Sequence, residues 1–168
     1  MKANYLLSIL SEDRKGLVSI ITSMLNRKGI DMESISTART DIHTQVVINI
    51  QLFAKADEIK LMALKIKNIV EVYHTEVKLL QDTSYQKTGL YILDTEGYNS
   101  TILKTIQKHG ATIVNYGAEG IVLQKTGRDE DIQVLYNELE GQYLKSFSKS
   151  AAMSLQPLYV DDDMLVMQ

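Results

Sequence analysis

Residues 4–25, NYLLSILSEDRKGLVSIITSML, decide how the chain begins to fold. Residues 4–10 form a short, mostly apolar run, which predicts a buried strand. After it, apolar residues recur at the spacing of one face of an amphipathic helix: Leu17, Ile20, Ile21, Met24 and Leu25. The polar stretch between strand and helix, residues 11–16, ends in a glycine and reads as a turn. The fold therefore begins with a strand, a glycine loop and a helix.

The same kinds of pattern continue outward from this stretch to residue 80. Gly29 follows a basic pair and is a typical helix stop. After it we predict a strand at residues 30–39, a turn at 40–44 and a well-alternating strand at 45–53. A helix at residues 56–68 and a fourth strand at 70–80 follow. The order strand, helix, strand, strand, helix, strand is the ferredoxin-like arrangement. This arrangement is an α+β fold, with an antiparallel sheet and both helices on one face.

The order then recurs after a polar stretch. Residues 81–87 (QDTSYQK) are the linker candidate. Beyond it we predict a strand at residues 90–93, a helix at 98–109, and a pair of strands, 111–116 and 120–124, around the hairpin 117–120. A helix at residues 129–139 and a last strand within 143–158 follow. The acidic, then apolar residues 161–168 read as a tail. The sequence thus predicts two βαββαβ domains, 1–80 and 88–160, with linker 81–87 and tail 161–168.

The composition is that of a globular protein. The chain has 168 residues, of which 45% are hydrophobic and 23% charged, and its formal net charge is −3. That balance gives no electrostatic footprint for nucleic acid or an anionic membrane. No apolar run is long enough to span a bilayer. The chain contains no cysteine, which excludes disulfides and thiolate chemistry and fits a cytoplasmic protein.

Few residues suggest catalysis or metal binding. His43, His74 and His109 stand alone, without a second ligand at the spacing that a metal site needs. The glycines of residues 117–120 lie between two strands, which favours a hairpin over a dinucleotide site. The acidic run 161–163 lacks the spaced ligands of a calcium loop. We therefore expect no catalytic residue, no metal ligand and no cofactor bound by this chain.

The loop at residues 11–16 is the exception, and it admits two interpretations. A helix N-terminus presents unpaired backbone N–H groups and a partial positive charge, which favour an anion such as a carboxylate. Gly16 lets a ligand approach the backbone, and Asp13 could hold a ligand ammonium. Alternatively, Asp13 caps the helix and Gly16 only turns the chain. The loop alone leaves both interpretations open.

Residues 5–50 resemble the ACT domain of the acetolactate (acetohydroxyacid) synthase small subunit, the regulatory subunit of that enzyme. The chain has LSIL at residues 7–10, then Asp13 and Gly16 of the glycine loop. The most specific match is GIDMESI at residues 29–35, which fits the family pattern G-[ILVY]-[ND]-[IM]-E-S-[IL]. The resemblance extends more weakly through residues 85–158, where ATIVN (111–115) and KSAAMSL (149–155) match the family's second domain.

The resemblance implies a non-catalytic subunit that binds a branched-chain amino acid, usually valine, at the interface of an ACT homodimer. The glycine loop of one chain would meet the second strand of the other. The implied ligand residues are Asp13, Arg14, Lys15, Gly16, Leu17, Asp31, Met32 and Ala38. The implied partner is the acetolactate synthase catalytic subunit, which holds thiamine diphosphate, FAD and Mg²⁺. The small subunit would activate it and confer feedback inhibition.

The chain departs from the family pattern at the implied site. Aspartates, Asp13 and Asp31, stand where the family has asparagines, and two carboxylates repel the carboxylate of an amino acid. The family's hairpin is shortened to residues 39–45 and lacks its Ser-Arg pair. The second domain lacks the usual R-E-[LM] opening and has QKTGL at residues 86–90. The alternatives are a free-standing ACT-type amino-acid sensor with another partner and, less favoured, a small enzyme on the same scaffold.

Overall fold

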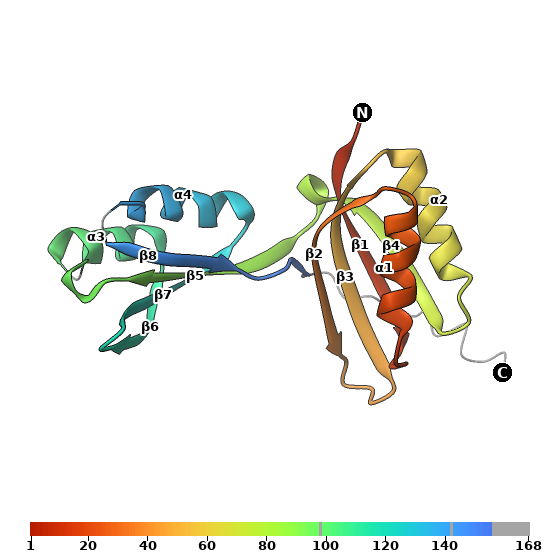
Figure 1. Cartoon of the computed structure of the whole chain (residues 1–168), viewed down its shortest axis with the longest axis horizontal. Coiled ribbons are helices and arrows are strands. Elements are labelled where there is room, and N and C mark those ends of the chain that lie inside the picture. Colours follow the sequence, from red (N-terminus) through yellow and green to blue (C-terminus); the bar gives the residue numbers. More distant parts are fainter. Residues whose placement is uncertain (98, 142, 156–168) are drawn as a thin grey trace. The chain divides into compact units, whose positions relative to one another are not determined.

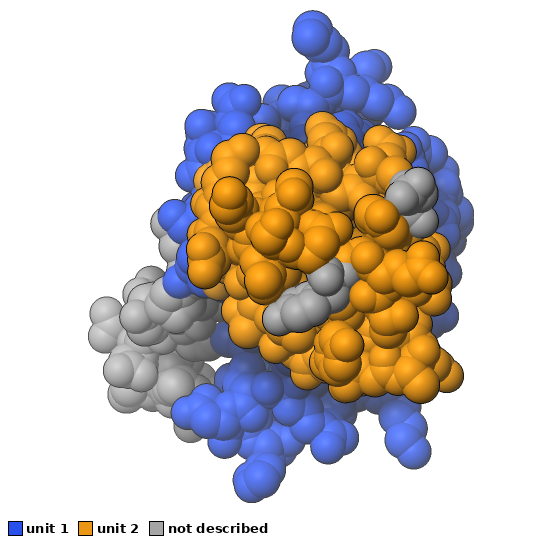
Figure 2. All heavy atoms as spheres, turned by 90° about the vertical axis from the view of Figure 1, so that its left-hand side faces the viewer, with its two compact units in different colours: residues 1–85, 151–168 blue, residues 86–150 orange. Residues whose placement is uncertain are grey.

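The computed structural model describes residues 1–97, 99–141 and 143–155. The chain forms two compact units, which Figure 2 distinguishes by colour. Of the described residues, the first contains 1–85 and 151–155, and the second contains those between 86 and 150. The second unit is therefore an insertion: the chain leaves the first unit after Tyr85 and returns to it at Ala151.

The first unit is a four-stranded antiparallel sheet with two helices on one face (Figure 1). Its elements are β1 (Ala3–Glu12), α1 (Leu17–Arg27), β2 (Asp31–Arg39), β3 (Gln45–Ala54), α2 (Ala56–Lys67) and β4 (Val72–Leu79), followed by the 3-10 turn η1 (Leu80–Asp82). The strand order is β2-β3-β1-β4, so β2 and β4 are the edges. This is the predicted ferredoxin-like order.

Apolar side chains of β1 and β3 form the core with the inner faces of the helices. From α1 the buried residues are Leu17, Ile21 and Leu25, three of the five apolar positions that the sequence pattern identified. Ile20, which belongs to the same pattern, is 52% exposed. Gly29 ends the helix region in the left-handed conformation, with φ +65°, which glycine adopts at least cost.

The second unit repeats the arrangement. Its elements are β5 (Tyr85–Leu93), the 3-10 turn η2 (Thr95–Gly97), α3 (Ser100–His109), β6 (Thr112–Gly117), β7 (Gly120–Gly127), α4 (Asp129–Leu139) and β8 (Leu144–Lys149), and the short β9 (Met153–Ser154) follows where the chain has returned to the first unit. The strand order is β6-β7-β5-β8, and β9 also pairs with β5. Gly117 pairs with Gly120 in the β6–β7 ladder, which confirms the predicted hairpin. Asn99 caps α3 by accepting hydrogen bonds from the amides of Thr101 and Ile102.

The segment between the domains differs from the sequence prediction. Residues 81–87 were expected to be a linker, but they contain most of η1 and the start of β5. That strand begins at Tyr85, not at residue 90, because Tyr85, Lys87 and Gly89 continue its inward-facing alternation. The last predicted strand, 143–158, is divided into β8 and β9. The predicted tail, 161–168, lies outside the described residues.

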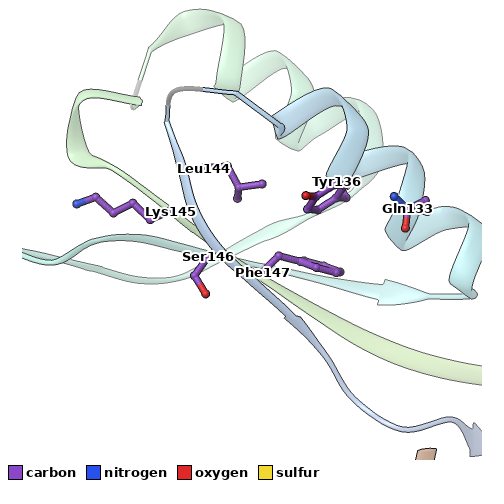
Figure 3. A pocket seen from close by; sticks show the side chains of 6 residues that line it. All are labelled: Gln133, Tyr136, Leu144, Lys145, Ser146 and Phe147. Atoms are coloured by element: carbon purple, nitrogen blue, oxygen red, sulfur yellow. The ribbon is translucent and has the colours of Figure 1, made fainter. Parts of the chain in front are cut away.

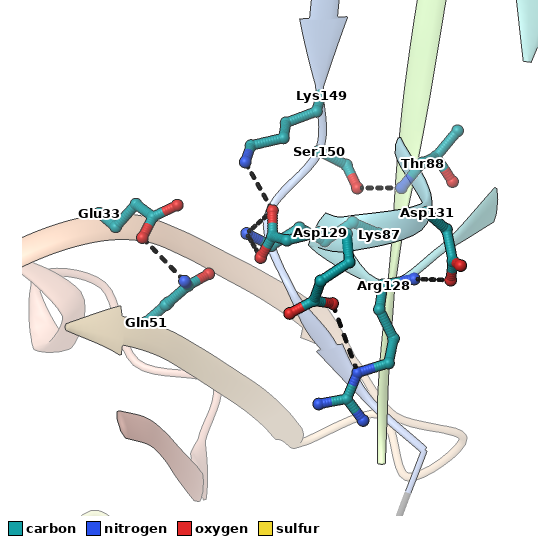
Figure 4. Close-up of polar contacts among 10 residues, drawn as sticks. Glu33, Gln51, Lys87, Thr88, Arg128, Asp129, Asp131, Lys149 and Ser150 are labelled. Carbon is teal, nitrogen blue, oxygen red and sulfur yellow. Dashed lines mark hydrogen bonds and ion pairs between the residues drawn. The ribbon is translucent and has the colours of Figure 1, made fainter. Parts of the chain in front are cut away.

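An ion-pair cluster joins the two strands that enter and leave the second unit to α4 (Figure 4). The ammonium of Lys87, on β5, lies 2.7 Å from a carboxylate oxygen of Asp129, the first residue of α4, and its side chain is 1% exposed. Lys149, at the end of β8, lies 2.5 Å from the other oxygen. Nearby, the amide of Thr88 donates to Ser150 Oγ at 2.9 Å. One carboxylate thus ties both strands to a helix N-terminus.

These two sheets, each with a pair of helices, are the predicted α+β class with two ferredoxin-like domains. Among the residues that the structure describes, no helix has the length and apolar character needed to cross a membrane.

Candidate functional site

The glycine loop is shorter than the sequence predicted, because β1 continues through Ser11 and Glu12. Residues 13–16 then lead directly into α1. The amide of Asp13 donates to the carbonyl of Thr44 at 2.7 Å, which fixes the loop against the turn between β2 and β3. Gly16 is the N-cap of α1, in the left-handed conformation with φ 87° and ψ −12°. The loop therefore has a defined backbone that glycine makes possible.

Asp13 does not cap α1, so the predicted cap is wrong, whereas Gly16 does turn the chain into the helix. The N-cap is Gly16, three residues further on, and α1 has no side-chain cap. Instead, the carboxylate of Asp13 accepts a hydrogen bond from Nε of Arg39, the last residue of β2, at 2.6 Å. The carboxylate that the sequence placed beside the ligand is thus already compensated by a cation.

The N-terminus of α1 keeps the electrostatic character of an anion site. Its first turn contains no acidic residue, so no side chain offsets the positive end of the helix dipole. Arg14 pairs with Glu71, which precedes β4. The amide of Leu17 donates to the carbonyl of Arg14 at 3.3 Å, and its side chain is buried in the core. Leu17 would therefore contribute to a site through its position in the helix, not through its side chain.

The structure separates the predicted site residues into two groups within one chain. Asp31 pairs with Phe53, at the end of the sheet where β1 begins. Arg39 pairs with Val46, at the end where β1 leads into the glycine loop. At roughly 3.3 Å per residue, these two ends of β2 lie on the order of 26 Å apart. Asp31 and its neighbour Met32 therefore cannot meet the loop of their own chain.

The other predicted residues lie at the loop end. Arg14, Lys15 and Gly16 are exposed, and so is Ala38, the neighbour of Arg39 on β2. Ala38 lies at this end of β2, but its side chain points to the opposite face of the sheet from that of Arg39. Sequence reasoning missed Arg39 and Glu71, because an ion pair between distant segments depends on strand register, and no local pattern encodes it.

Arg39→Gln tests whether the Asp13–Arg39 pair holds the loop in place. The Arg39 side chain is 75% exposed, and exposed pairs contribute about 0–1 kcal/mol. We expect the free energy of unfolding, measured with urea, to fall by less than about 1 kcal/mol. Lys108→Gln is the control, because it breaks the similarly exposed pair with Glu138. A substantially larger loss of unfolding free energy for Arg39→Gln alone would show that the pair holds the loop in place.

The second unit has a hollow of about 330 Å³ between α4 and β8 (Figure 3). Two of its polar side chains, Tyr136 and Lys145, have partners. The hydroxyl of Tyr136 donates to Glu140 at 3.2 Å, and Lys145 pairs with Asp94 at 3.0 Å. The negative charge of Glu140 raises the pKa of Tyr136, which keeps the hydroxyl protonated. Tyr136 therefore does not act as a base at neutral pH.

The isolated histidines do not converge. His109 ends α3 and lies 3.0 Å from Glu138 of α4, so its partner is a carboxylate as well as the helix dipole. Within the described ranges, no three histidine, aspartate or glutamate side chains are placed to hold a metal ion.

Comparison with known proteins gives similarities along nearly the whole chain. No protein-family model matches it. The acetolactate synthase small subunit of Mycobacterium leprae is 20% identical over 150 residues, which cover 89% of each chain. That of Mycolicibacterium smegmatis is 20% identical over 156 residues, covering 89% of this chain and 88% of the relative.

A solved structure shares the fold. The acetolactate synthase small subunit of Thermotoga maritima aligns with a TM-score of 0.79 at 16% identity, over 92% of this chain and 99% of that one. The similarity therefore includes both units. The resemblance predicted from the glycine loop and residues 29–35 is confirmed: the chain is similar over almost its whole length to acetolactate synthase small subunits.

Proposed function

We propose that this protein is the non-catalytic, regulatory small subunit of an acetolactate synthase. The observation that carries the proposal is the match to named small subunits over 89% of the chain, together with the fold shared with the Thermotoga maritima small subunit. In this role it activates a cytoplasmic catalytic subunit, which supplies thiamine diphosphate, FAD and Mg²⁺. A branched-chain amino acid, with valine as the first candidate, acts as feedback inhibitor.

The amino acid would bind between two ACT domains. Since Asp31 and Met32 lie far from the loop of their own chain, a site that contains both groups needs a second chain. The strand β2 is a sheet edge, so two sheets can lie side by side through it. A two-fold axis then brings each loop to the partner's Asp31 and creates two equivalent sites.

At such a site, different groups of the protein would bind the carboxylate and the ammonium of the amino acid. The amides at the N-terminus of α1 favour the ligand carboxylate. Because Arg39 pairs with Asp13, that carboxylate no longer carries an uncompensated charge. The partner's Asp31 is then left to bind the ligand ammonium. In this way the two aspartates that replace the family's asparagines are compatible with a zwitterionic amino acid.

Calorimetric titration of the chain with valine, leucine and isoleucine tests the ligand, and co-elution with an acetolactate synthase catalytic subunit tests the partner. We expect saturable binding of at least one of the three amino acids and a stable complex with the catalytic subunit.

The second candidate is a free-standing ACT-type amino-acid sensor with another partner. The shortened hairpin at residues 39–45, where Arg39 is turned to Asp13, favours it. Amino-acid binding without any complex with the catalytic subunit would select this candidate.

A further inference from the structure

Glu71, in the turn between α2 and β4, contacts the glycine loop and its approach twice. The amide of Glu12 donates to the carbonyl of Glu71 at 2.8 Å, and the carboxylate of Glu71 pairs with the guanidinium of Arg14. The side chain of Glu71 is 14% exposed, whereas that of Arg14 is 62% exposed. The pair therefore attaches the loop to the sheet through a carboxylate that is mostly shielded from water.

A bulge in β4 precedes this contact along the sheet. The partners of two successive β1 residues are His74 and Val72, so Tyr73 is one extra residue in β4. A bulge bends its strand and re-aims the residues beside it, and bulges recur next to functional sites. Past the bulge, residue 71 stands opposite Glu12, where β1 ends and the loop begins.

The loop is held from both sides. On the side away from Glu71, the amide of Asp13 donates to Thr44 and the carboxylate of Asp13 pairs with Arg39. Between these attachments, four amides donate to no backbone carbonyl of the described residues: Lys15, Gly16, Val18 and Ser19. These amides belong to the helix N-terminus that the proposed site offers to the ligand carboxylate, so their directions depend on how the loop is held.

We propose that Glu71 is a positioning residue of the amino-acid site, which acts through Arg14 and does not touch the ligand. The role rests on the proposed function. Because Glu71 compensates the charge of Arg14, the ligand carboxylate binds the amides and not this guanidinium. Holding a loop in its binding conformation before the ligand arrives raises affinity, because less ordering is left to the binding step. Arg14, which the family resemblance implies as a ligand residue, thus contributes to binding indirectly.

Glu71→Gln tests this role on the full chain, because it removes the carboxylate charge and keeps the carbonyl that accepts from Glu12. Calorimetric titration with valine, leucine and isoleucine should show an affinity about fivefold lower than that of the native chain, since an ion pair with an exposed member contributes up to about that factor. Glu76→Gln is the matched control. It makes the same change of net charge and breaks the pair with Lys78 on β4, so its affinity should stay at the native value.

Unfolding in urea separates positioning from a structural role. The urea midpoints of Glu71→Gln and Glu76→Gln should be equal, because a misplaced loop weakens binding without unfolding the unit. A lower midpoint for Glu71→Gln would overturn the positioning role in favour of a structural one. Equal affinities of the two variants for the amino acid would overturn it as well.

A charge swap separates positioning from direct contact with the ligand. Arg14→Glu and Glu71→Arg each place like charges together and should weaken binding, whereas the double variant restores the pair and should bind within about twofold of the native chain. If Arg14 contacted the ligand, the double variant would place a carboxylate beside that of the ligand and stay weak, which would overturn the proposal. A native chain that binds none of the three amino acids would overturn the proposed site itself, and the role of Glu71 with it.

Discussion

Replacing Asp129 by alanine should destabilise the second unit by about 3–5 kcal/mol, the usual cost of removing one member of a buried ion pair. Lys87 is 1% exposed and lies 2.7 Å from this carboxylate. Without Asp129, the ammonium group of Lys87 stays buried and loses the carboxylate that faces it. Amide hydrogen exchange of peptides from residues 86–150, compared with peptides from residues 1–80, would measure the loss in the correct unit.

Two control variants separate the ion pair from other effects. Glu130→Ala removes an exposed acid from the same first turn of α4, so it reports the helix-dipole contribution, typically about 0.3–1 kcal/mol. Combining Lys87→Met with Asp129→Ala removes both members of the buried pair, and replacing a whole buried pair by apolar side chains is often neutral or stabilising. If Asp129→Ala costs no more than Glu130→Ala, the cluster does not stabilise this unit.

The stabilisation of the second unit by the Asp129 carboxylate should depend on pH. Burial raises the pKa of Asp129, but the hydrogen bonds and charges of Lys149 and Lys87 outweigh it, so the pKa lies below its ordinary value of 3.8. A group with a lowered pKa in the folded state contributes stability above its ordinary pKa and loses it as the pH falls through the lowered value. The difference between the native chain and Asp129→Ala should therefore shrink as the pH falls below 3.8.

Gly16→Asp should abolish feedback inhibition and leave activation of the catalytic subunit intact. A Cβ at Gly16 meets nothing within 4 Å, so the new side chain clashes with no neighbour, although the φ of +87° puts backbone strain on it. The new carboxylate occupies the N-terminus of α1, where we propose that the carboxylate of the amino acid binds. Losing one or two hydrogen bonds to a charged group costs about 1.5–3 kcal/mol each, which corresponds to at least about a tenfold weaker affinity.

Gly110→Asp is a matched control for this variant. Gly110 also has a positive φ, +59° against +87°, and also has open space around its Cβ position. It ends α3 in the second unit, so it carries similar backbone strain away from the proposed site. Inhibition by the amino acid should survive Gly110→Asp. Unchanged inhibition in Gly16→Asp would place the ligand elsewhere on the molecule.

The parts of the fold that the sequence predicted are those set by local patterns. The boundaries of α4 agree with the prediction, since its apolar spacing and acidic first turn are both local. The strand β5 was recognised only in part, because two of its five inward positions are Lys87 and Gly89. A Cβ at Gly89 would lie 2.9 Å from Ile132, and Lys87 is accommodated by Asp129. Both reasons are tertiary, so alternation of apolar residues could not reveal them.

In the candidate site, too, local features follow from the sequence and features that depend on distant residues do not. The glycine loop and its place before a helix follow from the sequence alone, and the structure confirms both. The Asp13–Arg39 pair depends on the register of β2 against β3, which distant residues decide. The distance between the loop and Asp31 depends on the direction of β2. It is this distance that makes a second chain necessary for the proposed site.

Turnover of an acetolactate synthase catalytic subunit, titrated with this protein, tests the central claim most directly. The account predicts that acetolactate formation rises and saturates as the protein is added, and that a branched-chain amino acid then lowers it. The Gly16→Asp variant should raise the rate equally and leave it insensitive to the amino acid. A rate that stays unchanged at every concentration of this protein, with no complex formed, would contradict the account.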